Sequence, residues 1–188
     1  MRIISGKFKG RKIYPPKNLP TRPTTDRLKE GLFNILQNRL EYTNIKVLDL
    51  YSGTGNISYE FASRGSLNIT SVDQNRLCVD FIKKTSLLLN SDINAIRSDS
   101  INFLKKNNNQ FNLIFADPPY DIHYKTYKNI IDLSIEKLLN NGILIIEHNK
   151  KIDFNTEPCY YMNRKYGDSV ISFFNSNLNK QACKPDSV

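Results

Sequence analysis

The chain has 188 residues, which suits one well-buried domain and leaves too little for two full ones. Hydrophobic residues make up 39% and charged residues 24%, no stretch reaches the roughly 18 to 20 apolar residues of a membrane helix, and residues 1–7 hold no apolar signal core. These features exclude a membrane protein and predict a cytoplasmic globular domain, while the net charge of +9 indicates a polyanionic partner.

The first part of the chain is basic. Residues 3–13 predict a short hairpin or extended arm, because Gly6 and Gly10 stand where the chain must turn. The cations of residues 1–17, where no acidic residue occurs, are Arg2, Lys7, Lys9, Arg11, Lys12 and Lys17. We expect this basic arm, residues 1–25, to contact phosphate groups; the alternative is a merely solvated basic edge.

Prolines keep residues 15–23 out of helix, and Thr24, Thr25 and Asp26 then offer N-cap oxygens to an amphipathic helix over residues 26–40. From there strand and helix patterns alternate. Strands are expected at 47–51, 69–72, 93–97, 111–116 and 143–146, with helices at 56–64, 75–89, 100–105 and 127–139. Strands separated by helices imply parallel crossovers, hence an open doubly wound α/β sheet with ligands at the carboxyl ends of its strands.

The end of the chain departs from this alternation. Residues 160–166 and 169–174, joined at Gly167-Asp168, predict a terminal hairpin that finishes the sheet with an antiparallel edge. The domain would then span residues 26–174, and residues 175–188 have too little apolar content to fold and are expected to form a disordered tail. His123 and His148 are interpreted as exposed loop histidines.

A glycine loop follows the first strand as Asp49-Leu50-Tyr51-Ser52-Gly53-Thr54-Gly55. Its two glycines let backbone amides approach a ligand. A dinucleotide fingerprint would place a third glycine at position 58, where this chain has Ser58, which argues against NAD. Asp49 at the strand end suits a cationic amino group better than a pyrophosphate.

Acidic residues also follow the next two strands. Asp73 stands where a carboxylate can accept from both hydroxyls of a ribose, although it could instead favour the dipole of the following helix. Asp99, followed by Ser100, could accept from an adenine amino group or cap a short helix. Together with the glycine loop, these acids describe a pocket for S-adenosyl-L-methionine, whose expected residues are Asp49, Tyr51, Ser52, Gly53, Gly55, Asp73, Asp99 and Ser100.

The strand at residues 111–116 delivers Asp117-Pro118-Pro119-Tyr120 to the same edge of the sheet. An amine on a base is a poor nucleophile, and Asp117 and the carbonyl of Pro118 could each accept one of its N–H groups. The two prolines stiffen the loop, and Tyr120 offers a face for a base taken out of its stack. The alternative is a rigid turn after a strand. The sequence predicts methyl transfer to a base amine without a metal, and three dispersed cysteines without a CxxC pair agree with this.

These residues resemble the bacterial 16S rRNA guanine-N2 methyltransferases of the RsmD type, over residues 2–174. The resemblance rests on Arg2-Ile3-Ile4-Ser5-Gly6, Gly10-Arg11-Lys12, Ala62-Ser63-Arg64-Gly65, Tyr166-Gly167-Asp168, the two loops above, and above all Arg22-Pro23-Thr24-Thr25-Asp26-Arg27 with Glu30 and Leu32-Phe33-Asn34. The chain departs from the family at Tyr51-Ser52-Gly53-Thr54-Gly55, where Phe-Ala-Gly-Ser-Gly is usual, and at Asp73, where Glu is usual.

The resemblance implies a seven-stranded Rossmann-like class I methyltransferase that acts on a guanine of 16S rRNA, within a small-subunit assembly particle. We expect the protein to be a monomer. It also implies that residues 22–27 belong to the cofactor and substrate cleft and that the basic arm touches RNA. The expected substrate contacts are Lys7, Lys9, Arg11, Lys12, Arg22, Thr25 and Arg27.

Other functions fit parts of the pattern. An adenine-N6 DNA methyltransferase would use the same Asp-Pro-Pro-Tyr loop, but 188 residues leave no room for a separate duplex-recognition domain. A non-catalytic RNA-binding assembly factor would not need acids at all four strand ends. A hydride-transfer enzyme is disfavoured by Ser58.

Overall fold

A computed structural model of the chain describes residues 1–16, 19 and 24–177. The strands are β1 (Lys46–Leu50), β2 (Asn68–Asp73), β3 (Ile93–Arg97), β4 (Phe111–Ala116), β5 (Leu138–Asn149), β6 (Tyr160–Tyr166) and β7 (Ser169–Asn175). The helices are α1 (Asp26–Leu36), α2 (Asn56–Ser63), α3 (Arg76–Leu88), α4 (Ser100–Lys106) and α5 (Tyr124–Glu136), with the short 3-10 helix η1 (Tyr42–Asn44) before β1.

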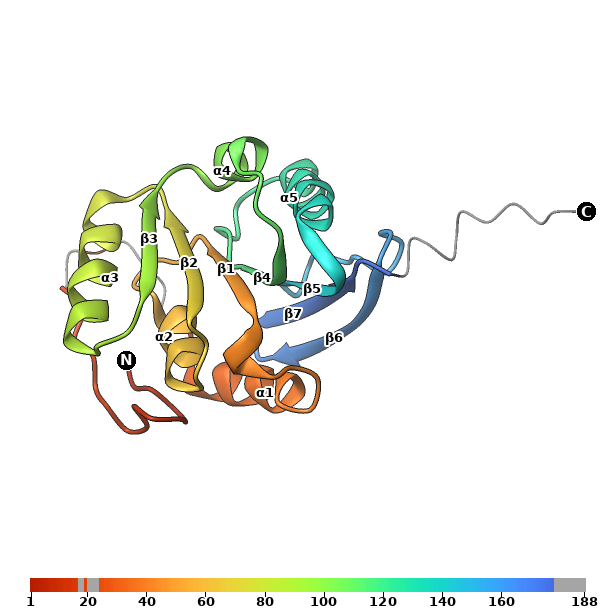
Figure 1. Ribbon diagram of the computed structural model, residues 1–188. Coiled ribbons are helices and arrows are strands. Elements are labelled where there is room, and N and C mark those ends of the chain that lie inside the picture. Colours follow the sequence, from red (N-terminus) through yellow and green to blue (C-terminus); the bar gives the residue numbers. More distant parts are fainter. Residues whose placement is uncertain (17–18, 20–23, 178–188) are drawn as a thin grey trace, which may run out of the picture.

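One seven-stranded sheet has the order β3-β2-β1-β4-β5-β7-β6 (Figure 1). Strands β1 to β5 pair with one another in parallel, and β7 pairs antiparallel with both β5 and β6. The predicted doubly wound sheet with an antiparallel terminal hairpin is therefore confirmed. The chain winds outward from β1 to β3 and then returns to place β4 on the other side of β1, so the strand order reverses between β1 and β4. Ligands of open α/β sheets bind at such a reversal.

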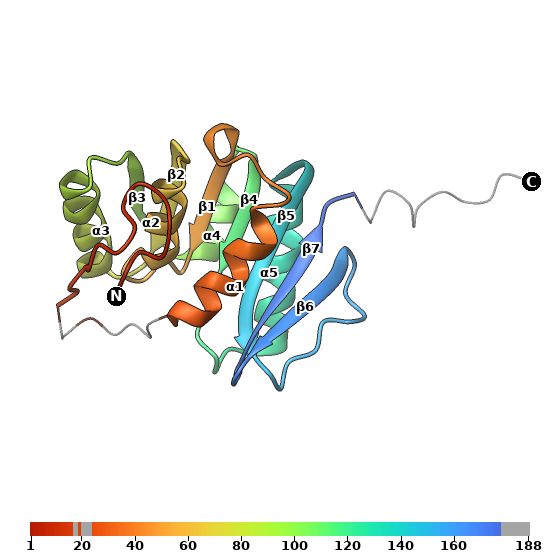
Figure 2. The same cartoon turned by 90° about the horizontal axis from the view of Figure 1, so that it is seen from below.

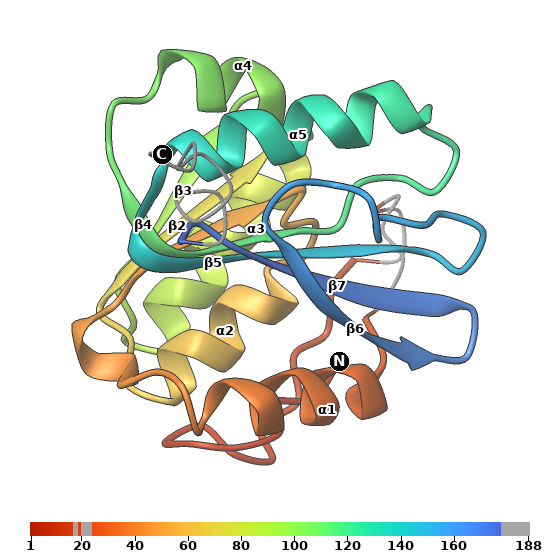
Figure 3. The ribbon, with the colours of Figure 1, turned by 90° about the vertical axis from the view of Figure 1, so that its right-hand side faces the viewer.

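Helices cover both faces of the sheet, as Figures 2 and 3 show. Alternate residues along each strand point to opposite faces, so that Val47 packs with α1, α2 and α3 while Leu48 packs with α4 and α5. Every central strand is thus apolar on both sides, which explains why the strands of the sequence are nearly continuous hydrophobic runs.

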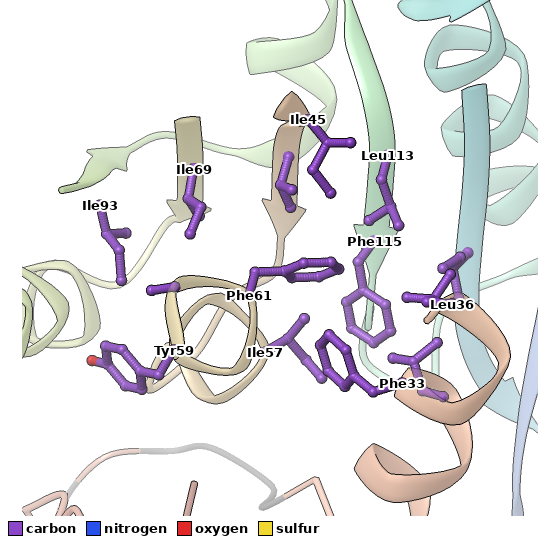
Figure 4. Packing of buried hydrophobic residues seen from close by; sticks show 14 of the residues in the cluster. Phe33, Leu36, Ile45, Ile57, Tyr59, Phe61, Ile69, Ile93, Leu113 and Phe115 are labelled. Atoms are coloured by element: carbon purple, nitrogen blue, oxygen red, sulfur yellow. The ribbon is translucent and has the colours of Figure 1, made fainter. Parts of the chain in front are cut away.

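Helix α2 packs tightly against the sheet. Figure 4 shows Phe61 reaching from α2 toward the strands, and Ile57 lying close to Phe115 of β4 and Phe33 of α1. The rings of Phe33 and Phe61 meet edge to face with centroids 4.8 Å apart. This contact fixes α1 against α2, and the first turn of α2 carries part of the candidate site described below.

Residues 2–13 of the basic arm fold as a closed loop rather than a free extension. An isolated antiparallel bridge joins Arg2 and Lys12, and Ile3 and Ile13 are buried in the core shared by α1, α2 and α3. The loop packs on the end of α2, where a Cβ at Gly6 (φ +86°) would lie 1.9 Å from the carbonyl oxygen of Ser63. The predicted hairpin-like turn is confirmed, and glycine is required at position 6.

Two element boundaries differ from the sequence-based expectation. The first helix ends at Leu36 instead of residue 40, although Leu40 still packs on the core, which explains why the apolar period overran the helix. The helix expected at 127–139 begins at Tyr124 and ends at Glu136, because Leu138 pairs with Phe111 as the first residue of β5. A register shift then separates Leu138 from the central part of that strand.

The last described residues are hydrogen-bonded, contrary to a tail that begins at residue 175. Asn175 pairs with Ile143, and the backbone N–H of Ser176 donates to the carbonyl of Gly142 over 3.3 Å. Residues 178–188 of the expected tail lie outside the described residues. Among the helices that the structure describes, none has the length and apolar character needed to cross a membrane.

Candidate functional site

The glycine loop and the Asp-Pro-Pro-Tyr loop leave the sheet side by side. The register pairs Leu50, the last residue of β1, with Ala116, the last residue of β4. The backbone N–H of Asp117 also points at the carbonyl of Leu50, over 3.4 Å. Since both strands run in the same direction, the two loops must begin at one point on the sheet edge. This is the point where the strand order reverses.

A cavity of about 390 Å³ lies between the two loops. Eleven of the twelve residues proposed from the sequence for cofactor binding and catalysis border it: Asp49, Tyr51, Ser52, Gly53, Asp73, Asp99, Ser100, Asp117, Pro118, Pro119 and Tyr120. Gly55 does not. It caps α2 with φ +80°, and a Cβ there would lie 2.9 Å from Ile82 and Tyr59, so the packing around the start of α2 already requires this glycine.

Asp49 is 1% exposed and holds the first turn of α2. Its Oδ2 accepts from the hydroxyl of Ser58 at 2.6 Å and from the backbone N–H of Ser58 at 3.2 Å. Burial raises the pKa of Asp49 to about 7, although the two hydrogen bonds from Ser58 oppose the shift. Ser58 therefore does more than break a dinucleotide fingerprint, because its hydroxyl partly stabilises the ionised form of the carboxyl that borders the cavity.

Asp73 ties the end of β2 to the glycine loop. Its Oδ2 accepts from the backbone N–H of Gly53 and its Oδ1 from that of Asn75, both at 2.8 Å. Burial raises the pKa of Asp73 above its ordinary value, and these two backbone bonds oppose that shift. Each carboxylate oxygen keeps a further lone pair, so Asp73 can still accept from hydroxyls of a ligand in the cavity.

Asp99 is the N-cap of α4, which confirms one of the two roles expected for it. Its Oδ1 accepts from the backbone N–H of Asn102 at 2.9 Å, at the start of α4. It also borders the cavity, next to Tyr51 and Ser100. Burial, with the nearby Asp99 carboxylate, raises the pKa of Tyr51 to about 12. Tyr51 is held at φ +56°, the left-handed region that non-glycine residues seldom adopt.

The hydroxyl of Tyr120 is bonded to two strands of the sheet. Its hydroxyl donates to Oε1 of Glu147 over 3.2 Å and lies 2.8 Å from the hydroxyl of Ser169. Glu147 is fully buried on β5, next to His148, and Ser169 begins β7. The antiparallel hairpin therefore contributes to the position of the Asp-Pro-Pro-Tyr loop.

His148 is not the exposed loop histidine that the sequence suggested. It is buried within β5, where Nε2 lies 2.8 Å from the hydroxyl of Ser172 on β7. Burial lowers the pKa of His148 below its ordinary value. The terminal hairpin covers this residue, and that long-range pairing could not be read from the local sequence. His123 is exposed, as expected.

Several residues of the cavity wall were missed by sequence reasoning. They lie around the starts of α2 and α3: Thr54, Asn56, Ile57, Gln74, Asn75 and Cys78, with Phe115 on β4. Thr24, before α1, also borders the cavity, as the family resemblance implied for this residue. Asn75 could have been found, since an Asn before a helical pattern is an N-cap signal, and its Oδ1 accepts from the N–H of Leu77. Asn56 carried no such signal.

Those residues proposed to contact RNA that the structure describes do not border the cavity. Lys7, Lys9, Arg11 and Lys12 are exposed on the arm. The arm nevertheless reaches the glycine loop at its first residue, because the hydroxyl of Thr54 lies 3.5 Å from the sulfur of Met1. Thr25 is the N-cap of α1 and accepts from the N–H of Leu28, and Arg27 is exposed on the same helix. Arg22 lies outside the described residues.

Comparison with known sequences gives one family over nearly the whole chain. The family described as Conserved hypothetical protein 95 matches residues 1–175. The ribosomal RNA small subunit methyltransferase D of Buchnera aphidicola (subsp. Baizongia pistaciae) is 33% identical over 156 residues, 81% of this chain and 78% of that protein. The protein of the same name from Escherichia coli K12 is 30% identical over 148 residues, 78% of this chain and 71% of that protein.

Solved structures share the fold. A hypothetical protein of Thermus thermophilus superposes with a TM-score of 0.80 at 22% identity, covering 93% of this chain and 98% of its own. The T. thermophilus 16S rRNA N2 methyltransferase RsmC, solved with AdoMet and guanosine, superposes with a TM-score of 0.69 at 18% identity, covering 93% of this chain and 49% of its own. The sheet is thus the Rossmann-like sheet of methyltransferases. With the matches to the family and its methyltransferase D members, the chain belongs to the RsmD family of small-subunit ribosomal RNA methyltransferases.

Proposed function

We propose that this protein transfers a methyl group from S-adenosylmethionine to the exocyclic N2 amine of a guanine in 16S rRNA, on a small-subunit assembly particle in the cytoplasm. The observation that carries the proposal is the pairing of Leu50 with Ala116. Because of this pairing, the glycine loop after β1 and the Asp-Pro-Pro-Tyr loop after β4 line the same cavity. A donor and an acceptor of a methyl group can therefore meet in a single crevice.

The residues of the cavity fit S-adenosylmethionine. Its wall contains three strand-end carboxyls, Asp49, Asp73 and Asp99, which suit a cationic amino group, ribose hydroxyls and an adenine amino group. The hydroxyl oxygen of Ser52 is buried without a hydrogen-bond partner among the described residues, as expected of an atom that a ligand would satisfy. RsmC, a structural neighbour, was solved with AdoMet, and the relatives named above are rRNA methyltransferases.

S-adenosylmethionine supplies an electrophilic methyl group, so the protein needs to position the acceptor amine and stabilise the charge that develops on it. We assign this task to Asp117 and the carbonyl of Pro118. Each accepts one N–H of the amine, which turns the nitrogen lone pair away from the ring and toward the methyl group. Pro118 and Pro119 have no backbone N–H and so add no hydrogen-bond donor to the loop. The acceptors that remain for the amine are Asp117 and the carbonyl of Pro118.

We assign to Tyr120 the stacking of the target base. Its hydroxyl bonds to Glu147 and Ser169 leave the ring as the part that borders the cavity. A base that leaves its stack loses contact with its neighbours, and an aromatic face replaces part of that contact. The basic arm would hold the phosphates of the surrounding RNA.

The proposal is tested by incubating the protein with methyl-labelled S-adenosylmethionine and three separate substrates: naked 16S rRNA, small-subunit particles and duplex DNA. We expect label in RNA, preferentially in particles, and N2-methylguanosine as the labelled nucleoside after digestion. Label in N6-methyladenine of DNA would replace this function with that of a DNA methyltransferase. No labelled nucleic acid, together with RNA binding, would favour an assembly factor. The Asp117→Ala variant serves as the matched inactive control.

A further inference from the structure

A fully buried ammonium group joins the arm, α1 and α2. The side chain of Lys29 on α1 is 0% exposed. Its Nζ lies 3.1 Å from Oε1 of Glu60, 3.2 Å from Oδ1 of Asn56 and 3.3 Å from Oδ1 of Asp26, and it donates to the carbonyl oxygen of Arg2. A lysine can be buried at tolerable cost only when acceptors replace its water, and here acceptors from three segments do so.

The carboxyl of Glu60 is satisfied independently of Lys29. Its Oε1 also accepts from the backbone N–H of Ile4 at 2.9 Å, and its Oε2 from the guanidinium of Arg64 at 2.5 Å. Loss of the ammonium would therefore leave Glu60 paired with a cation and bonded to the arm. This matters because a variant of Lys29 would not strand a bare charge in the core.

The ammonium fixes which way the amide of Asn56 points. Because Oδ1 of Asn56 accepts from Lys29, its Nδ2 faces the opposite way and donates to the carbonyl of Thr24 over 3.2 Å. Asn56 and Thr24 both border the cavity between the two loops. Thr24 comes just before Thr25, the N-cap of α1, so the bond anchors the start of α1 to the start of α2.

We propose that Lys29 is a positioning residue for the cofactor. By orienting the amide of Asn56 it holds Thr24 in the wall of the cavity, and by binding the carbonyl of Arg2 it fastens the basic arm to the same wall. This role rests on the proposed function only in that the ligand of the cavity is S-adenosylmethionine. Lys29 itself does not border the cavity, so its effect on the ligand must be indirect, and the route that we propose runs through Asn56 and Thr24.

The test measures binding of S-adenosylhomocysteine by calorimetry, together with the midpoint of thermal unfolding. The variants are Lys29→Met, which keeps the apolar stem, Asn56→Ala, and the two combined. Lys128→Met is the matched control, because Lys128 pairs with Asp132 and Glu157 and does not border the cavity. We expect each of the two single variants to weaken binding roughly tenfold, as for one lost hydrogen bond to a charged group, and the control to bind as the wild type does.

The combined variant tests whether Lys29 affects cofactor affinity through Asn56. If Lys29 acts through Asn56, the double variant binds no more weakly than the weaker-binding single variant. Effects that add, or a Lys29→Met protein with a lower unfolding temperature and unchanged affinity, would overturn the role and leave a purely structural lysine. Asn56→Ala keeps every charge paired, so it remains testable if Lys29→Met does not fold, and unchanged affinity in it also overturns the proposal. Wild-type protein that binds no S-adenosylhomocysteine would instead overturn the proposed cofactor.

Discussion

The hydroxyl of Ser58 lies 2.6 Å from Oδ2 of Asp49, at a position where a dinucleotide-binding loop would have glycine. This hydrogen bond is one of two that lower a pKa which burial raises to about 7. The charge on Asp49 therefore changes within the physiological range. If the ionised carboxyl meets the ammonium of the cofactor, cofactor affinity rises as the pH rises through about 7.

Ser58→Ala should move that pH dependence upward. The variant loses the hydroxyl bond and keeps the backbone bond, so the pKa of Asp49 rises by roughly one pH unit, the equivalent of one hydrogen bond to a charged group. The measurement is calorimetric binding of S-adenosylhomocysteine to wild type and variant across a pH series of about two units on either side of neutrality. Titration of the ligand is common to both proteins and cancels in the comparison. Coincident pH profiles would show that Asp49 does not sense the ligand.

The same pKa predicts how stability depends on pH. The folded protein binds the Asp49 proton more tightly than the unfolded chain, whose aspartate has a pKa of about 3.9. The contribution of Asp49 to the free energy of unfolding therefore falls as the pH rises from about 4 to about 7 and is constant above that. Asp49→Asn, which can still accept from Ser58, should remove this slope. Denaturant unfolding across that range, with wild type and variant compared at each pH, measures it, and an unchanged slope contradicts the assignment.

Asp117→Ala should slow catalysis strongly while leaving cofactor binding nearly unchanged. The variant loses an acceptor that matters only as charge develops on the amine, so we expect kcat to fall roughly 100- to 1000-fold, as for the loss of one oxyanion-hole group. The affinity for S-adenosylhomocysteine should stay within a few-fold, since Asp73 and the glycine loop are untouched. A loss of cofactor affinity as large as the loss of kcat would assign Asp117 to the cofactor instead.

Replacing the four arm cations Lys7, Lys9, Arg11 and Lys12 by alanine should weaken RNA binding and flatten its dependence on salt. Each phosphate contact contributes to the slope of log affinity against log salt, by roughly 0.7 to 0.9 per contact. Affinity for small-subunit particles is measured across a salt series. Two exposed lysines away from the arm, Lys105 and Lys106 of α4, provide a control that removes positive charge elsewhere on the surface, two charges against four. Equal slopes for wild type and the arm variant would remove the arm from the interface.

The sequence was sufficient to predict features that depend on the order of strands and loops along the chain. It was not sufficient for residues whose surroundings come from distant segments. Two loops that follow adjacent parallel strands must share a sheet edge, so the presence of Asp49 and Asp117 in one cavity wall could be foreseen. Lys29 could not, because its burial requires the arm to fold back over α1 and present the carbonyl of Arg2. His148 was misjudged for the same reason, since the strand that covers it comes more than twenty residues later.

Two substitutions of Tyr120 separate the role of its ring from the role of its hydroxyl. Tyr120→Phe keeps the ring and loses the bonds to Glu147 and Ser169, whereas Tyr120→Ala loses both ring and bonds. If the ring stacks the target base, Tyr120→Ala raises KM for the RNA substrate roughly 10- to 100-fold, the equivalent of about 1 to 3 kcal/mol of stacking per base. Tyr120→Phe then raises it by less than about fivefold, because the loop prolines still hold the ring. Steady-state kinetics with small-subunit particles measures both, and an equal loss in the two variants would mean that the hydroxyl, rather than the ring, carries the function.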